Sequence, residues 1–170
     1  MLIMQEKEAL IGVYDASGKV VGKKTRNEVD KINDILKGVY IIVVNDKSGL
    51  LMIKAKDSLW HNKWGAGAGG LVRIDENVKD AALRTLKREF GIDGDLKFLA
   101  EQFYDFNGLK RFATIYFVEI NEDLKINRDD FSEWKWISFL EVEKMIASGE
   151  CMPMTEAALE LFVGSRLGEK

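Results

Sequence analysis

The sequence is poor in the residues that build disulfide-linked and zinc-binding proteins. Its 170 residues include one cysteine, Cys151, and one histidine, His61. A single cysteine cannot form a disulfide within the chain, and the usual zinc sites need several cysteines or histidines. The sequence therefore excludes disulfide scaffolds, zinc ribbons and multi-histidine metal sites. Any bound metal ion would have to take oxygen ligands, as magnesium does.

Long apolar stretches and an excess of one charge are also missing. No run approaches the roughly 18 apolar residues of a membrane span. Residues 1–8 lack the basic start and the longer apolar stretch of a signal peptide, so we expect a cytoplasmic protein with no membrane partner. With 25 basic and 28 acidic residues the formal net charge is −3. Binding to a nucleic-acid polymer is therefore not expected.

Linker-like composition is absent as well. The one proline is Pro153, and no stretch is rich in proline or in serine and glycine. A chain of this length can bury roughly 70% of its unfolded surface, and 46% of its residues are hydrophobic. We expect a single domain over residues 1–170.

Two hairpins are predicted in the first third of the chain. The first spans residues 8–24, where two β-like segments flank the turn sequence Asp15–Gly18. The second joins Val39–Val44 to Leu50–Ile53. Because the first strand of this second hairpin is almost wholly apolar, we expect it to lie in the centre of a sheet.

Helical and strand patterns alternate in the rest of the chain. A helix is expected over Asp75–Phe90, with Gly91 in the position after the helix that favours glycine. The remaining elements are predicted as strands at Leu96–Phe103, Phe112–Ile120 and Trp134–Ile137, and helices at Leu140–Ala147 and Thr155–Val163. This order predicts an α+β fold with a mixed sheet and helices on its faces.

One acidic side chain of the predicted helix faces the protein interior. At about 100° per residue, Glu89 falls in the same arc as a set of small and apolar residues. The members of this arc are Val78, Ala81, Ala82, Thr85 and Leu86. A buried carboxylate is costly unless a cation or hydrogen-bond donors meet it. The partner could be Arg84 or Arg88 in an ion pair, or a metal ion, and the helical pattern alone leaves both open.

A glycine-rich stretch precedes this helix. Residues 65–70 contain four glycines and two alanines, so mostly backbone is available there for close contacts. If the stretch leads into a loop ahead of the helix, its carbonyl and N–H groups could contact a hydrated cation and the phosphates bound to it. The alternative is a tight turn after a strand.

The spacing of residues 70–92 resembles the Nudix box, GX5EX7REUXEEXGU, in which U is apolar. Seven of its nine specified positions agree, namely Gly70, Glu76, Arg84, Leu86, Glu89, Gly91 and Ile92. Thr85 and Arg88 depart from the pattern, which has glutamate at both positions. Outside the box, the chain is similar to the branch of MutT-like Nudix proteins related to isopentenyl-diphosphate isomerase. That similarity lies in residues 8–15, 25–29, 54–57, 69–70, 133–138 and 155.

The resemblance implies an α/β/α sandwich that hydrolyses a diphosphate linkage in a nucleoside diphosphate-linked compound. The implied cofactor is Mg²⁺ or Mn²⁺. Glu89 and the carbonyl of Gly69 would be metal ligands, and Glu133 would be a further ligand or a catalytic base. Glu76 and Arg84 would form an ion pair that ties the loop to the helix, as part of the catalytic apparatus.

Substrate contacts are predicted on the basic and aromatic residues near the box. Lys54, Lys56 and Arg73 are the basic residues best placed in the sequence to meet phosphate oxygens. Trp64 could stack on a nucleobase, and the alternative is that it packs in the core. The sequence does not indicate which group is attached to the diphosphate. A hydrophobic sheet edge or the first hairpin could pair two copies, so a homodimer stays open.

The two departures from the box leave three functions to consider. In the first, the protein is a hydrolase with one magnesium ion, coordinated largely by the phosphates of the substrate. In the second, Arg88 replaces the charge of the metal, and the protein binds a diphosphate compound without cleaving it. The third, a prenyl-diphosphate isomerase, is the weakest, because that chemistry needs a reactive cysteine and a histidine-containing metal site, and neither Cys151 nor His61 suits those roles.

Overall fold

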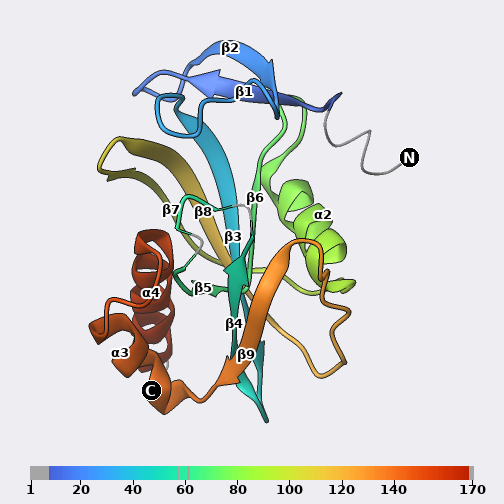
Figure 1. Ribbon diagram of the computed structural model, residues 1–170, viewed down its shortest axis with the longest axis vertical. Helices are drawn as coiled ribbons and strands as arrows, with labels where there is room; N and C mark the ends of the chain where they lie inside the picture. The colour runs from blue at the N-terminus through green and yellow to red at the C-terminus, as the bar shows by residue number, and fades with distance from the viewer. Residues whose placement is uncertain (1–7, 57, 61, 169–170) are drawn as a thin grey trace.

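A computed structural model describes residues 8–56, 58–60 and 62–168. Its main element is a mixed sheet between two helical layers, with helix α2 on one face and helices α3 and α4 on the other (Figure 1). The predicted α+β class and α/β/α arrangement are confirmed. No helix among the described residues is long and apolar enough to cross a membrane.

Strand β3 (Leu36–Asn45) lies at the centre of the sheet. It runs parallel to β8 (Leu109–Glu119) and antiparallel to β4 (Gly49–Ala55), and β7 (Lys97–Phe106) pairs with the far side of β8. The strand β9 (Phe131–Ile137) pairs with β4. The apolar run around residues 39–44 thus takes the buried central position that its composition predicts.

The predicted N-terminal hairpin forms a small separate sheet at one end of the molecule (Figure 1). Strands β1 (Leu10–Tyr14) and β2 (Val20–Thr25) pair antiparallel. The carboxylate of Asp15 accepts hydrogen bonds from the backbone N–H groups of Ser17 and Lys19, which fixes the turn. A bridge between Ile11 and Arg73 places this hairpin beside the segment that leads into α2.

The glycine-rich stretch forms strands, and not the loop or the tight turn that the sequence left open. It forms two short strands, β5 (Gly65–Ala66) and β6 (Ala68–Leu71), and β6 pairs antiparallel with β3. At Gly67, which has a φ of 65°, a Cβ would overlap with the carbonyl oxygen of Ile41. Because glycine has a low strand propensity, the local sequence does not predict a strand here. The glycine is needed because only glycine permits this close backbone approach.

Helix α2 (Val78–Phe90) begins later than the sequence predicts. Asn77 caps it by accepting a hydrogen bond from the Asp80 N–H at 2.9 Å, so Asp75 and Glu76 lie in the preceding turn instead of the first helical turn. Its end is as predicted, since Gly91 adopts a left-handed conformation with φ of 68°.

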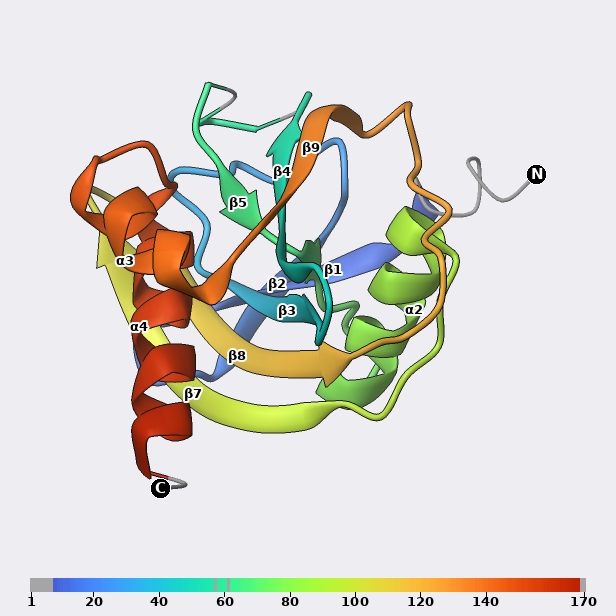
Figure 2. The ribbon, with the colours of Figure 1, turned by 90° about the horizontal axis from the view of Figure 1, so that it is seen from below.

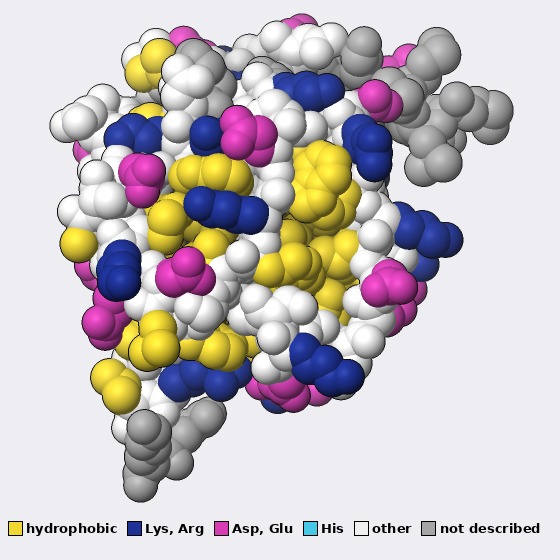
Figure 3. All heavy atoms as spheres, turned by 60° about the horizontal axis from the view of Figure 1, so that its bottom comes forward, with side chains coloured by type: hydrophobic (Ala, Val, Ile, Leu, Met, Phe, Trp, Pro, Cys, Tyr) yellow, Lys and Arg dark blue, Asp and Glu magenta, His cyan; other side chains and the backbone are white. Residues whose placement is uncertain are grey.

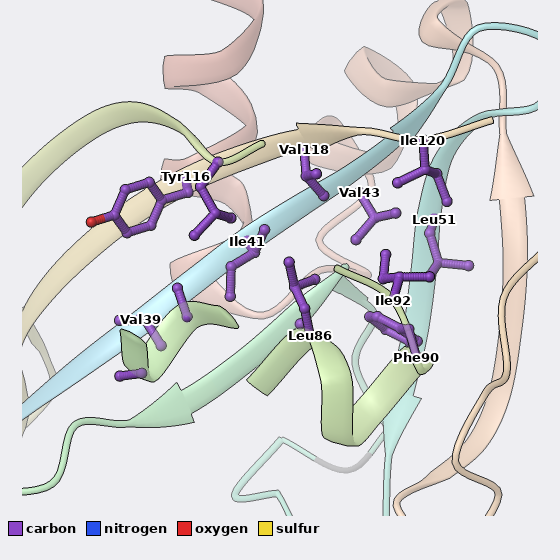
Figure 4. Close-up of a cluster of buried hydrophobic side chains, with 14 of the residues drawn as sticks. Val39, Ile41, Val43, Leu51, Leu86, Phe90, Ile92, Tyr116, Val118 and Ile120 are labelled. Atoms are coloured by element: carbon purple, nitrogen blue, oxygen red, sulfur yellow. The ribbon is translucent and has the colours of Figure 1, made fainter. Parts of the chain in front are cut away.

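Two hydrophobic clusters fix the helices to the sheet. On one face, Leu86 and Phe90 of α2 point toward strand side chains that include Val43 and Val118 (Figure 4). On the other face, α3 (Phe139–Ala147) and α4 (Pro153–Gly168) cover a second cluster that includes Phe162 (Figure 2). The two faces of the sheet therefore present different sets of side chains, and each candidate residue belongs to one of them.

Candidate functional site

Glu89 is buried on the inward face of α2. It is 6% exposed, and the buried residues of the same helix are Ala81, Ala82, Thr85, Leu86 and Phe90. The predicted orientation of Glu89 is confirmed. A carboxyl group at this depth has lost its contact with water and needs compensation from the protein or from a ligand.

The two oxygens of Glu89 have different partners. Oε1 accepts a hydrogen bond from Nη2 of Arg88 at 2.9 Å, and Oε2 accepts one from the backbone N–H of Gly69 at 3.4 Å. Nε of Arg88 also lies 4.0 Å from a carboxylate oxygen of Asp130. The ion-pair alternative is therefore present for Arg88, whereas Arg84 pairs with Glu76.

Burial sets the charge state of Glu89. Loss of solvent raises the pKa of its carboxyl to about 7, although the positive charge and hydrogen bond of Arg88 act in the opposite direction. The negative charge of Asp130 adds to the increase. At neutral pH the group is thus divided between its protonated and ionised forms, and a nearby dication would favour the ionised one.

The backbone of Gly69 faces the helix that carries Glu89. Val72 N–H donates to the carbonyl oxygen of Lys37 at 3.0 Å, and positions in an antiparallel pair alternate between hydrogen-bonded and open. The pair Tyr40–Gly69, three steps further along the ladder, is therefore an open one. Both the N–H and the carbonyl of Gly69 point away from β3, which agrees with the hydrogen bond from its N–H to Glu89.

Thr85 fills the space where the family pattern has a carboxylate. Its Oγ1 donates to the carbonyl oxygen of Ala81 at 2.8 Å, and a Cβ on Gly70 would lie 2.5 Å from that same Oγ1. Thr85 therefore packs against β6 at Gly70. Within the ranges that the structure describes, no group of three or more histidine, cysteine, aspartate or glutamate residues could hold a metal ion.

The Glu76–Arg84 ion pair is present as predicted. Nε and Nη2 of Arg84 donate to the two oxygens of Glu76 at 2.7 and 2.9 Å, and Nη2 also donates to the carbonyl of Leu71 at 3.0 Å. Burial raises the pKa of Glu76, but the bonds from Arg84 and from the Arg73 N–H outweigh it, so the net pKa is below its ordinary value. The pair ties the turn before α2 to the helix.

Three other predicted site residues lie on the opposite face of the sheet. Nζ of Lys54 is 3.3 Å from Oε1 of Glu133 and 4.7 Å from the centre of the Trp64 ring. Trp64 is 8% exposed and belongs to the cluster under α3 and α4. The structure thus groups Lys54, Glu133 and Trp64 with one another and does not bring them to Glu89. Trp64 packs in the core, which was the alternative to stacking on a base.

The remaining predicted basic residues lie apart from each other. Nζ of Lys56 donates to the carbonyl oxygen of Arg128 at 2.6 Å. Arg73 lines a small pocket with Arg26 and Arg84 beside the N-terminal hairpin. Residues 57 and 61, and with them the sequence expectations for Asp57 and His61, lie outside the described residues.

Two residues that contact predicted site residues or their ion-pair partners were missed by the sequence analysis. Lys135 places its Nζ 4.4 Å from the centre of the Trp64 ring, and its position two residues after Glu133 on a strand was the available signal. Asp130 approaches Arg88 from the segment before β9, and nothing in the local sequence indicates that contact.

On the face of the molecule shown in Figure 3, acidic and basic side chains are interspersed with exposed hydrophobic side chains.

Comparison with protein families finds one match that covers most of the chain. The model of the NUDIX domain matches residues 35–153. An uncharacterised Nudix hydrolase of Pseudomonas aeruginosa is 26% identical over 132 residues, which are 75% of this chain and 78% of that protein. Isopentenyl-diphosphate Delta-isomerase 2 of Photorhabdus laumondii is 23% identical over 146 residues, 82% of each chain.

Solved structures with the same fold include one from Deinococcus radiodurans, described as DR0079. It has a TM-score of 0.74 and 19% identity, and the match covers 90% of this chain and 99% of that one. The NUDIX domain of Shewanella oneidensis NrtR, in complex with ADP ribose, has a TM-score of 0.64 and 16% identity over 83% and 95% of the chains. At these identities the likeness concerns the fold.

Proposed function

The chain belongs to the NUDIX family, and we propose that it hydrolyses a diphosphate linkage in a nucleoside diphosphate-linked compound with the help of Mg²⁺ or Mn²⁺. The observation that carries this proposal is the buried carboxyl of Glu89 beside the outward-facing backbone of Gly69. The family supplies the reaction class, and the site supplies the place where the cation would act.

The donor set fits one ion and does not fit two. Magnesium is commonly held by one or two carboxylates, with substrate phosphates and water completing its shell. Glu89 and the carbonyl of Gly69 can supply two oxygen ligands, and no group of three or more histidine, cysteine, aspartate or glutamate residues in the described chain could hold an ion by itself, so substrate phosphates would have to complete the shell of a single ion. Bound there, a divalent ion would neutralise the charge that develops on the phosphate oxygens.

Residues of the chain itself would position the substrate and the metal ligands. The Glu76–Arg84 pair holds the turn that follows β6, so both are positioning residues in this proposal. Lys56 and Arg73 stay the predicted phosphate contacts on the basis of charge. Glu133, which the family resemblance implies as a further ligand or base, pairs with Lys54 on the opposite face of the sheet, and this argues against its sharing an ion with Glu89.

The substrate class rests on the chemistry of a fold neighbour. The NUDIX domain of NrtR is described in complex with ADP ribose, a nucleoside diphosphate linked to a sugar. A compound of this class brings its own phosphate oxygens to the cation, which compensates for the few carboxylates that this chain provides. That is why we favour a diphosphate substrate that completes the coordination shell.

A second candidate function is binding without cleavage. The observation that favours it is the 2.9 Å contact between Nη2 of Arg88 and Oε1 of Glu89, which already places a positive charge on the carboxylate. In that case the guanidinium would take the place of the cation and meet the diphosphate directly.

The environment of Cys151 argues against the isomerase alternative. Its cysteine candidate, Cys151, is 3% exposed, and burial raises the pKa of the thiol to about 11. A neutral thiol in that setting is a poor proton-transfer group at neutral pH.

A paired assay of release and binding distinguishes the two candidates. Phosphate release is followed from a panel of nucleoside diphosphate compounds, with and without Mg²⁺ or Mn²⁺, while thermal shift reports binding. The hydrolase proposal expects metal-dependent release that Glu89→Gln lowers by at least about 100-fold, while Glu143→Gln on the exposed side of α3 leaves it unchanged. A thermal shift without release supports the binding module and refutes the hydrolase.

A further inference from the structure

A segment outside the box closes over the C-terminal end of the helix that carries Glu89. Residues 124–130, which we call the strap, lie between β8 and β9 and run past the end of α2 (Figure 2). The N–H of Lys125 donates to the carbonyl of Phe90, and the N–H of Asn127 donates to the carbonyl of Glu89, both at 2.9 Å. Carbonyls in the last turn of a helix have no partner within the helix. The strap supplies two of these partners and is thereby fixed to α2.

The other end of the strap is anchored to the sheet. The N–H of Lys56, the residue after β4, donates to the carbonyl of Asp130 at 2.9 Å. Two side chains of the strap, Leu124 and Ile126, pack against the hydrophobic cluster on the α2 face. The backbone at residue 130 is therefore held by both the helix and the sheet, and this gives the side chain of Asp130 a defined starting point.

Asp130 presents its carboxylate to Arg88. The amide nitrogen of Asn127 donates to Oδ2 of Asp130 at 3.1 Å, which orients the carboxylate. Nε of Arg88 lies 4.0 Å from this same Oδ2, whereas Nη2 of Arg88 lies 2.9 Å from Oε1 of Glu89. The guanidinium is therefore within hydrogen-bond distance of Glu89 and about 1 Å beyond that distance from Asp130.

A divalent ion on Glu89 would reverse the preference of Arg88. The negative charge of Glu89 attracts the guanidinium, but a dication bound to that carboxylate is the largest local charge and repels it. Asp130 keeps its negative charge in both situations. A movement of about 1 Å brings Nε of Arg88 within hydrogen-bond distance of Oδ2, where a charge-assisted hydrogen bond can form.

We propose that Asp130 is a positioning residue that takes over the guanidinium of Arg88 when a divalent ion binds to Glu89. Arg88 stabilises the buried carboxylate before the ion binds and moves toward the strap when the ion arrives. Asp130 thus acts on the metal site through Arg88 and is not itself a ligand. The inference rests on the proposed function, because that function places the ion at Glu89.

Mn²⁺ affinities in a double-mutant cycle test this role without substrate or turnover. In calorimetric titrations of the full chain with MnCl₂, Asp130→Asn should weaken binding by about tenfold when Arg88 is present and by less than about twofold in the Arg88→Met background. Asp130→Glu keeps the charge and should bind Mn²⁺ within about threefold of the wild type. The matched control is Asp129→Asn, which removes the same charge from an exposed neighbour on the strap and should bind Mn²⁺ as the wild type does.

Nuclear magnetic resonance follows the guanidinium directly. The Nε–H resonance of Arg88, identified by its loss in Arg88→Met, should shift when Mg²⁺ is added to the wild type. In Asp130→Asn the shift should be clearly smaller, because the acceptor on the strap has lost its charge. A resonance that does not respond to Mg²⁺ in the wild type, under conditions where Mg²⁺ binds, overturns the proposal.

The cycle also separates this inference from the proposed function. Unchanged Mn²⁺ affinity in Asp130→Asn overturns the inference. So does an equal loss with Arg88 and with Arg88→Met, since Asp130 would then act without the arginine. Both results leave Mn²⁺ binding through Glu89 intact. A wild type that binds no more Mn²⁺ than Glu89→Gln refutes the proposed metal site, and the role of Asp130 falls with it.

Discussion

Glu89 carries a buried carboxyl whose charge state depends on the surrounding pH. Below about pH 4.5 the group is protonated in both the folded and the unfolded chain, and above its folded pKa of about 7 it is ionised in both. Between these values only the unfolded chain loses the proton, so stability that Glu89 contributes is lost as pH rises through this window.

The pH dependence of stability should therefore differ between the wild type and Glu89→Gln. With a chelator present to remove metal ions, the free energy of unfolding of the wild type should fall by on the order of 3 kcal/mol between pH 4.5 and 7.5. The cause is the titration of Glu89, because burial raises its pKa from 4.5 to about 7. Residue 89 does not titrate in Glu89→Gln. The free energy of unfolding of this variant, measured with urea, should therefore increase relative to that of the wild type as pH rises. Parallel pH profiles for the two proteins would contradict the assignment, and Glu143→Gln serves as the control.

Arg88 is the residue that competes with a metal ion for Glu89. Replacing it by glutamate removes a positive charge 2.9 Å from Oε1 of Glu89 and adds a possible ligand. We predict that Arg88→Glu binds Mn²⁺ about tenfold or more tightly than the wild type, measured by electron paramagnetic resonance of free Mn²⁺.

A control separates the two effects of that substitution. Arg88→Met removes the charge without adding a ligand and should give a smaller gain in Mn²⁺ affinity than Arg88→Glu. Equal Mn²⁺ affinity in the wild type and Arg88→Glu would show that the arginine does not compete with the ion.

Thr85→Glu, the other change toward the family pattern, should instead destabilise the fold, since Thr85 is fully buried beneath Gly70.

At the scale of elements, the contact between β6 and α2 depends on a glycine. A Cβ at Gly70 would lie 2.5 Å from Oγ1 of Thr85, so Gly70→Ala should cost about 1–3 kcal/mol in urea unfolding. The added Thr85→Ala change removes the obstacle, and the double variant should recover part of the loss. Gly22→Ala is the matched control, because a Cβ there meets nothing within 4 Å. Additive effects of the two substitutions would refute the proposed contact.

Helices and strands were predicted correctly where the side-chain pattern repeats. They were missed where backbone contacts between distant segments determine the structure. The body and end of α2 follow from its apolar period and from Gly91, whereas its start depends on the cap made by Asn77. The strands at residues 65–71 were missed because glycine favours turns in a local analysis, and the reason for glycine there is the distant chain at Ile41. Long-range backbone contact leaves little trace in local sequence.

At the scale of the whole molecule, the sheet separates the candidate residues into two groups. Glu89, Glu76 and Arg84 belong to the α2 side, and Glu133 pairs with Lys54 on the side of α3 and α4. We therefore predict that Glu133→Gln leaves Mn²⁺ affinity within about twofold of the wild type, while Glu89→Gln lowers it by at least about tenfold. Comparable losses in both variants, measured by calorimetry, would place the two carboxylates on one ion.

The sequence predicted the overall architecture more completely than it predicted the site. The order of apolar strands and amphipathic helices was enough to predict the α+β class, and the spacing from Gly70 to Ile92 indicated the family. The face on which Glu133 lies depends on the register between β9 and β4, including the irregularity after Lys54. A shift of one residue in such a pairing moves a side chain to the opposite face, so sequence alone could not place it.

The most direct test of the account is a crystal grown with MnCl₂ and measured for anomalous scattering from manganese. We predict one manganese peak within bonding distance of a carboxylate oxygen of Glu89, with the carbonyl oxygen of Gly69 in the same coordination shell. A structure in which Glu89 stays paired with Arg88 and no peak lies beside Gly69 would contradict it.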